Sequence, residues 1–186
     1  AGWASFAVEG GEITCETPEL SLRRSVLRHG SNVEVRDELT NRTGADLPVV
    51  IVNALDVGDV AGIREFRLSG QLQARFWAST SPTEGRQTAA TPTAYVERDT
   101  GAVGFVMEDD ALRNQGSFLV WDSTVAMGDD MLYLAPGASR TLVWRIFPLA
   151  EPGYFGLVNV LRHEWKLFGE IPGLFGFVHP SSTERM

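Results

Sequence analysis

The sequence predicts a mainly β fold, a two-layer antiparallel β-sandwich with one C-terminal α-helix. Many short runs alternate apolar with polar side chains, and turn residues separate these runs. No helical pattern lies between the runs, which argues against a parallel sheet with crossover helices. Only residues 154–168 place apolar side chains at helical spacing. Two packed antiparallel sheets are therefore the expected architecture.

Alternation in the first half of the chain predicts strands at residues 3–8, 12–16, 20–27, 33–39 and 47–52. A hairpin joins the third and fourth of these across Gly30. In the fourth strand the acidic and basic residues Glu34, Arg36 and Glu38 are expected to face solvent. Asp37 interrupts the apolar row on the opposite face. Residues 47–52 are so apolar that we expect both faces of that strand to be buried.

The second half predicts further strands at residues 63–68, 71–78, 93–98, 102–108, 117–126, 131–134 and 141–147. Residues 128–130 read as a turn. Residues 79–92 are rich in Ser, Thr, Ala and Pro, which is typical of a long surface loop.

The strands at 131–134 and 141–147 are joined by a turn, in which Pro136 and Gly137 suit the two central positions of type II. Along 141–147 one face is apolar and the other mixed, so the mixed face is expected to be partly covered. Pro148 lacks an N–H and should close the strand. The helix that follows has one apolar stripe, made of Tyr154, Val158, Leu161, Trp165 and Phe168.

Composition excludes several classes of partner. The 186 residues include 16 basic and 24 acidic side chains, a formal net charge of −8. An acidic protein is a poor ligand for nucleic acid or for an anionic membrane surface. No apolar run reaches the ~20 residues that a membrane-spanning helix needs. We therefore expect neither nucleic-acid nor membrane partners.

The single cysteine, Cys15, excludes an internal disulfide and a multi-cysteine zinc site, and its alternating strand predicts a buried thiol. The chain opens on Ala1-Gly-Trp without an initiator Met or signal peptide, and its last residues, 180–186, read as a cut. We expect residues 1–169 to form the sandwich domain with its helix. Residues 170–186 are then a tail or linker toward a following domain.

The densest acidic cluster is Glu108-Asp109-Asp110, which could supply oxygen ligands to Ca²⁺ or a general acid and base. Adjacent residues on a strand point to opposite faces, so a solvated strand end is the competing interpretation. His29, His163 and His179 lie far apart in sequence, and no Gly-x-Ser-x-Gly elbow or phosphate loop is present. We assign no catalytic residue and expect no cofactor other than this candidate Ca²⁺.

Five tryptophans are many for this length. Trp121, Trp144 and Trp165 lie in strongly patterned segments, where core packing is expected. Trp3 and Trp77 lie nearer to loops or an end, so these two, with Arg75, are the candidates for carbohydrate binding. Asn41-Arg42-Thr43 matches a glycosylation sequon.

Several motifs together resemble a known family: the segment 104–110, the turn 134–140, Trp144-Arg-Ile-Phe-Pro148, Tyr154-Phe-x-x-Val-Asn159 and Arg162-x-x-Trp165. They are similar to the β-sandwich domain that precedes the catalytic barrel in large bacterial glycoside-hydrolase-like proteins, which has the galactose-mutarotase-like supersandwich fold. The resemblance covers about the last 80 residues by motif and the rest by strand pattern. It implies a bacterial protein with an extracellular or periplasmic location. The catalytic histidines and glutamate of the mutarotases do not map onto this chain.

Three functions follow from these features. The first is a non-catalytic accessory domain of a glycoside-hydrolase-like parent, which docks on a neighbouring domain through Phe168, Ile171, Leu174, Phe175 and Phe177. The second is a polysaccharide-binding module with exposed aromatic side chains in a row or cleft. The third is a stand-alone mutarotase- or lyase-like enzyme, which needs a cleft with His and an acid or base within reach. We expect this chain by itself not to be an enzyme.

Overall fold

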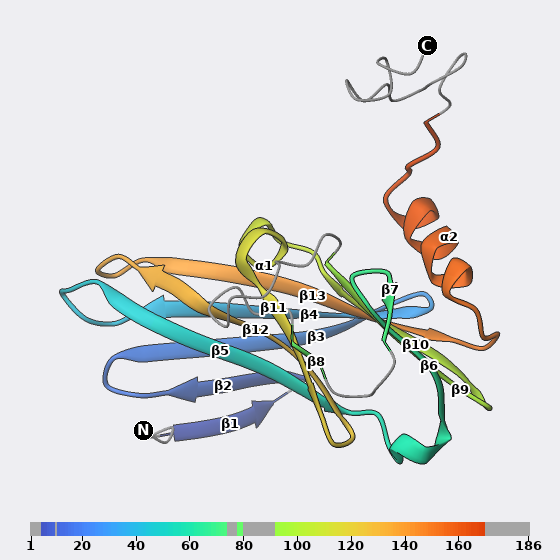
Figure 1. Cartoon of the computed structure of the whole chain (residues 1–186). Coiled ribbons are helices and arrows are strands. Elements are labelled where there is room, and N and C mark those ends of the chain that lie inside the picture. Colours follow the sequence, from blue (N-terminus) through green and yellow to red (C-terminus); the bar gives the residue numbers. More distant parts are fainter. Residues whose placement is uncertain (1–4, 10, 74–77, 80–91, 170–186) are drawn as a thin grey trace, which may run out of the picture.

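The computed structural model describes residues 5–9, 11–73, 78–79 and 92–169, which form two packed antiparallel sheets (Figure 1). In spatial order, the larger sheet consists of β1 (Ser5–Glu9), β2 (Glu12–Glu16), β3 (Leu20–His29), β4 (Asn32–Asn41), β13 (Ser139–Leu149), β10 (Gly101–Met107), β9 (Thr93–Arg98), β6 (Ile63–Leu68) and β7 (Gln71–Leu72). The smaller sheet consists of β5 (Leu47–Asp56), β12 (Thr124–Leu134), β11 (Ser117–Trp121) and β8 (Ala78–Ser79). The predicted antiparallel sandwich is confirmed.

The main core fills the space between the sheets. Alternate residues of β4 and β13, among them Leu39, Leu142 and Trp144, meet Phe118 and Met127 of the smaller sheet. All five side chains are buried. Each contributes about 1.5–3 kcal/mol of burial, which makes this layer the principal source of stability. Cys15 is buried as predicted.

A second, smaller core lies on the other face of the larger sheet, beneath α2 (Tyr154–Glu164). Leu157 and Leu161 of the helix pack against the buried side chains Tyr95, Val106 and Phe147. This confirms that the mixed face of β13 is covered. The buried helical stripe contains Leu157, which is fully buried, whereas the predicted Val158 is only partly buried.

Close approach of α2 to the sheet depends on Gly104. A Cβ atom at this position of β10 would overlap the side chain of Leu157.

Within the described ranges, no helix is long and apolar enough to cross a membrane.

Two turn predictions are confirmed and two strand predictions are wrong. Gly30 and Gly137 both adopt positive φ, and Ala138 N–H donates to the Ala135 carbonyl at 3.0 Å. Residues 117–126 are not one strand, because Asp122 adopts φ 48° and turns β11 into β12. Residues 71–78 are not one strand either: β7 and β8 belong to different sheets.

The predicted turn at 128–130 lies inside β12, where the register shifts between Asp129 and Leu132. Asp129 is buried, and its carboxylate accepts hydrogen bonds from Gln115 Nε2 and Met131 N–H. β13 continues to Leu149, past the predicted end at Pro148. At Pro148, β13 is paired with β10 only, because its pairing with β4 ends at Ile146.

Two burial predictions are also wrong. The strand at 47–52 buries one face only: Val50 is 70% exposed and Val52 48%. Glu34, predicted to face solvent, is buried on the outer face of the larger sheet. The first error arises because Val50 and Val52 point to the outer face of the smaller sheet, away from the core, and the second arises because Glu34 is paired with two arginines. The predicted loop at 79–92 lies almost wholly outside the described residues.

Candidate functional site

A group of charged side chains lies on the outer face of the larger sheet, beside α2. We call it the Arg145 cluster; its members are the charged residues Glu34, Arg36, Glu108, Arg145 and Glu164, together with Trp165. Arg145 and Glu34 are register partners on β13 and β4, so their side chains meet across the strands. Arg145 donates to Glu34 Oε2 from Nη2 at 2.7 Å and from Nε at 3.0 Å.

Glu34 is the most buried member of the cluster. Burial disfavours its charged form, but hydrogen bonds from Arg36 and Arg145 outweigh that effect and hold the pKa of Glu34 below its ordinary value. The carboxylate is therefore ionised at neutral pH, with both oxygens engaged. This is the electrostatic pattern of a structural ion pair rather than of a poised proton donor.

The remaining members connect α2 to the sheet. Trp165 Nε1 donates to Glu108 at 3.2 Å, and Arg145 lies 3.9 Å from Glu108 and 3.6 Å from Glu164. The Arg113 guanidinium, on α1 (Asp110–Gln115), lies 5.5 Å from the Trp165 ring centroid. The end of α2 is thus anchored by a hydrogen bond, ion pairs and a cation–π contact.

This arrangement lacks the features of an acid–base centre. His29 Nε2 lies 3.9 Å from Glu34, beyond hydrogen-bond distance, and its imidazole is half exposed. His163 stacks edge-on against Phe168, and His179 lies outside the described residues. Within the described part of the chain, no group of three or more His, Cys, Asp or Glu side chains could hold a metal ion.

The candidate metal ligands Glu108, Asp109 and Asp110 do not converge on one point. Asp109 caps α1: its Oδ1 accepts from Ala111 N–H at 2.9 Å, and its Oδ2 accepts from Val143 N–H at 2.7 Å. Glu108 accepts from Trp165, and Asp110 is exposed in the first turn of α1. An Asp before a short helix-forming run is a capping signal that could have identified this role.

The candidate carbohydrate ligands Trp3, Arg75 and Trp77 lie outside the described residues. Of the tryptophans expected in the core, Trp144 is buried and Trp165 partly buried, but Trp121 is 39% exposed, which corrects that prediction. Tyr133 is 69% exposed.

Trp121 and Tyr133 do not form a common binding platform. Trp121 pairs with Thr124 at one end of β12, and Tyr133 lies near the other end. At about 3.3 Å per residue the two rings are roughly 30 Å apart, too far to stack on neighbouring sugars.

The sequon residue Asn41 has a structural role. It is fully buried, and its Nδ2 donates to the carbonyls of Ala45, Leu134 and Ala135 at 2.7–3.0 Å. In the folded chain this amide is inaccessible for glycosylation.

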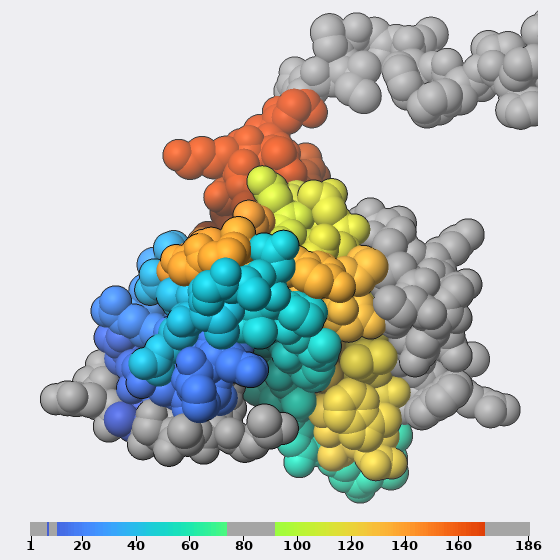
Figure 2. Space-filling model, turned by 90° about the vertical axis from the view of Figure 1, so that its left-hand side faces the viewer, coloured from blue at the N-terminus to red at the C-terminus, as the bar shows by residue number. Residues whose placement is uncertain are grey.

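Large apolar side chains are exposed just beyond α2. Leu167 is 55% exposed and Phe168 56%. The other candidate interface residues, Ile171, Leu174, Phe175 and Phe177, lie outside the described residues. Figure 2 shows α2 standing above the body of the sandwich. Leu167 and Phe168 form what we call the helix-end patch.

Solved structures share this fold. The chain resembles the Slr1438 protein of Synechocystis sp. PCC 6803 (10% identity, TM-score 0.54, covering 81% of this chain and 66% of that one). It also resembles a polysaccharide lyase (13%, 0.50, 87% and 24%) and an aldose 1-epimerase-like protein of Klebsiella pneumoniae (12%, 0.52, 89% and 58%). No protein-family model and no curated protein matches the sequence.

These likenesses establish a galactose-mutarotase-like β-sandwich, a fold that occurs in carbohydrate-active proteins. The chain spans less than two thirds of the length of each of the three structures. At such low identity the likeness concerns the fold and leaves the function to be argued from the surface of this chain.

Proposed function

We propose that this chain is a non-catalytic β-sandwich domain that packs on, and supports, a neighbouring domain of a carbohydrate-active protein. One observation carries the proposal: α2 is firmly fixed to the sandwich, yet it leads directly into exposed apolar side chains. Leu167 and Phe168 follow the helix, and the next residues, 171–177, have the same apolar character. Contiguous exposed apolar side chains are a feature of interaction surfaces.

The fixed position of α2 suits it to dock on a partner. Leu157 and Leu161 bury one side of the helix, and the hydrogen bond between Trp165 and Glu108 holds its end. A rigid apolar element loses little conformational entropy when it docks, so it can bind a partner with few contacts.

The Arg145 cluster supports a structural role over a catalytic one. Its most buried carboxylate, Glu34, is neutralised by Arg36 and Arg145, and Glu108 and Glu164 lie around the same guanidinium. A general acid or base needs a proton that titrates near working pH, whereas Glu34 is held ionised. The cluster therefore supports α2 rather than a reaction.

The test measures binding between this chain and the polypeptide that follows it in its parent protein, expressed separately, by isothermal titration calorimetry. We expect Leu167→Glu with Phe168→Glu to weaken the affinity about tenfold or more, because two carboxylates would be desolvated at the contact. The matched control is Leu72→Glu, an equally exposed leucine on β7.

Equal loss of affinity in both variants would contradict the proposal. Wild-type affinity in the Leu167→Glu, Phe168→Glu variant would also contradict it, because the helix-end patch would then not contribute to binding. A panel of soluble polysaccharides provides the competing outcome. Saturable binding of a glycan by the chain alone, lost when Trp121 or Tyr133 is replaced by Ala, would establish a binding module instead.

A further inference from the structure

The edge strand of the smaller sheet, β5, has the composition of a strand with a neighbour on each side. No charged residue occurs from Leu47 to Leu55, and Pro48 is the only residue there that discourages pairing. β5 pairs with β12 on one side, and no other described strand pairs with it on the other side. Its free side presents backbone N–H and C=O groups that another strand can bind.

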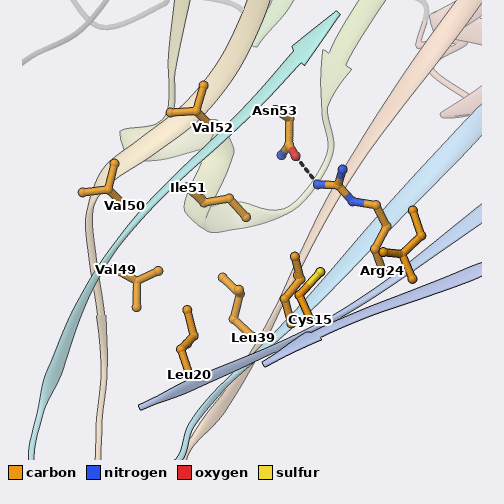
Figure 3. Close-up of a pocket in the computed structure, with 11 residues that line it drawn as sticks. Cys15, Leu20, Arg24, Leu39, Val49, Val50, Ile51, Val52 and Asn53 are labelled. Carbon is orange, nitrogen blue, oxygen red and sulfur yellow. Dashed lines mark hydrogen bonds between the residues drawn. The ribbon is translucent and has the colours of Figure 1, made fainter. Parts of the chain in front are cut away.

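A cavity of about 400 Å³ opens beside this edge, between β5 and the larger sheet (Figure 3). Apolar side chains of β2, β3, β4 and β5 form most of its wall: Cys15, Leu20, Leu22, Leu39, Val49 and Ile51. Beyond β3 the larger sheet continues with β2, whose Ile13 and Cys15 line the cavity, and then with β1. Apolar side chains are the natural occupants of such a space.

Arg24 and Asn53 form the polar end of the cavity, and their hydrogen bonds determine which charge an occupant can carry. Arg24 donates to buried Asp37 from Nε at 2.6 Å and from Nη2 at 2.8 Å, so its charge is already compensated. Arg24 also donates to Asn53 Oδ1. Asn53 Nδ2 has no hydrogen-bond partner among the described residues, although Asn53 is only 4% exposed. Figure 3 shows this amide between Arg24 and Ile51, at the cavity.

A buried amide without a partner is costly and calls for a neutral acceptor such as a carbonyl or hydroxyl oxygen. A carboxylate would be a poor occupant because Asp37 already neutralises Arg24. This argues against a fatty acid and in favour of a neutral, mainly apolar group that carries a hydrogen-bond acceptor.

We propose that β5 accepts an additional β-strand from a partner polypeptide, an uncharged segment with apolar residues at alternate positions. Its backbone pairs with the free edge of β5, and its inward side chains fill the cavity. An oxygen of the segment accepts the hydrogen bond from Asn53 Nδ2. The strand would lie over β2 and β1, at the usual spacing of about 4.8 Å from β5.

A second copy of the chain fits this edge less well than a single strand. The hydrogen bond between Arg24 of β3 and Asn53 of β5 places β5 above β3, so β1 and β2 project beyond it. Two copies paired through β5 around a two-fold axis would bring both projections into one layer, where they overlap.

The experiment uses the full chain and a synthetic peptide of about nine residues in which Val alternates with Thr, the length of an ordinary strand. Backbone amide exchange is measured by mass spectrometry with and without the peptide. We expect exchange in β5 to slow about tenfold at saturation, while that in β7, an edge strand of the larger sheet, stays unchanged. Alkylation of Cys15, on the cavity wall, should slow in parallel.

Two controls test whether protection of β5 depends on the apolar side chains of the peptide and on the cavity. A peptide in which Ser replaces each Val retains the backbone but lacks apolar side chains, and it should leave β5 unprotected. Cys15→Trp fills part of the cavity and should weaken the effect of the peptide. Leu72→Trp adds the same ring at an exposed site and should not. Retained protection of the β13 amides verifies that each variant is folded.

Each other outcome overturns the proposal. Absence of protection by the Val peptide rejects strand addition. Equal protection by the Ser peptide rejects the role of the cavity. Protection of β5 without peptide that grows with protein concentration identifies a second copy. Protection without peptide that is independent of concentration, and lost on deletion of residues 170–186, identifies the tail of this chain.

Discussion

The two outer faces of the sandwich differ in how their side chains are covered. On the larger sheet, α2 buries Tyr95 and Phe147, and the charged residues beside it are paired with one another. On the smaller sheet, Val50, Val52 and Tyr133 are exposed beside an edge that pairs with no other described strand. The chain thus completes one face by itself and leaves the other face apolar and open. We infer from this contrast that the β5 edge beside the open face is a second place, besides the helix-end patch, where the chain meets other polypeptides.

The largest expected effect is a difference in the free energy of unfolding between two variants, one with a substitution on each face. Leu157→Ala removes a fully buried side chain beneath α2 and should lower the free energy of unfolding by about 3 kcal/mol. Val50→Ala on the exposed face should change it by less than about 0.5 kcal/mol. Urea denaturation followed by tryptophan fluorescence measures both. Equal losses would mean that Val50 is already covered in the free chain.

The next largest effect concerns Glu34. Glu34→Gln keeps the shape of the side chain but removes the charge shared by Arg36 and Arg145, and should cost about 2 kcal/mol at pH 7. The pKa of Glu34 is lowered in the fold, so its contribution is present above its ordinary pKa of 4.5 and is lost as the pH falls below that value. Wild-type and variant stabilities should therefore converge progressively as the pH falls below 4.5 and through the lowered pKa of Glu34. A constant difference across that range would contradict the ion pair.

A smaller effect is expected at Asp109. Asp109→Ala removes the cap of α1 and the acceptor for Val143 N–H, at about 1–2 kcal/mol. Asp109→Asn should retain about half of that stability, because its single amide oxygen can cap α1 but its NH₂ group cannot accept from Val143 N–H. Thermal unfolding by circular dichroism distinguishes the two variants. If addition of Ca²⁺ stabilised the wild type and not Asp109→Asn, the carboxylate would be a metal ligand instead.

The sequence predicted local features well because they depend on local chemistry. Gly30 and Gly137 mark their turns, and the alternation predicted the observed ends of β2, β6 and β9 and placed β4 within two residues of its ends. The resemblance to mutarotase-like sandwiches agreed with the observed fold. These features require only backbone conformation and side-chain alternation.

The errors arose where tertiary pairing overrides local pattern. The local sequence predicts that Glu34 is solvated. In the fold, Arg145 of β13 lies opposite it, a contact between residues more than a hundred positions apart. Residues 128–130 read as a turn because the sequence does not reveal the irregular register of β12 at Asp129. The strand at 47–52 has the composition of a strand covered on both faces, but whether its second face is covered depends on what packs on the sheet, which the sequence does not reveal.

The cavity could not be predicted either, because it too depends on tertiary packing. Cys15, Arg24 and Asn53 come from three strands of two sheets, and none of them belongs to a motif. An Asn within an apolar strand is the only signal in the sequence that a buried polar site exists there. The helix-end patch, by contrast, follows from the apolar run after α2.

The most direct test of the contrast is an amide exchange map of this chain, alone and as part of the longer polypeptide to which we propose it belongs. We predict slower exchange in β5 and in residues 165–169 within the longer protein, with β4 and β13 unchanged. Identical exchange in both contexts would contradict the account, because the open face and the helix-end patch would then be ordinary solvent-exposed surface.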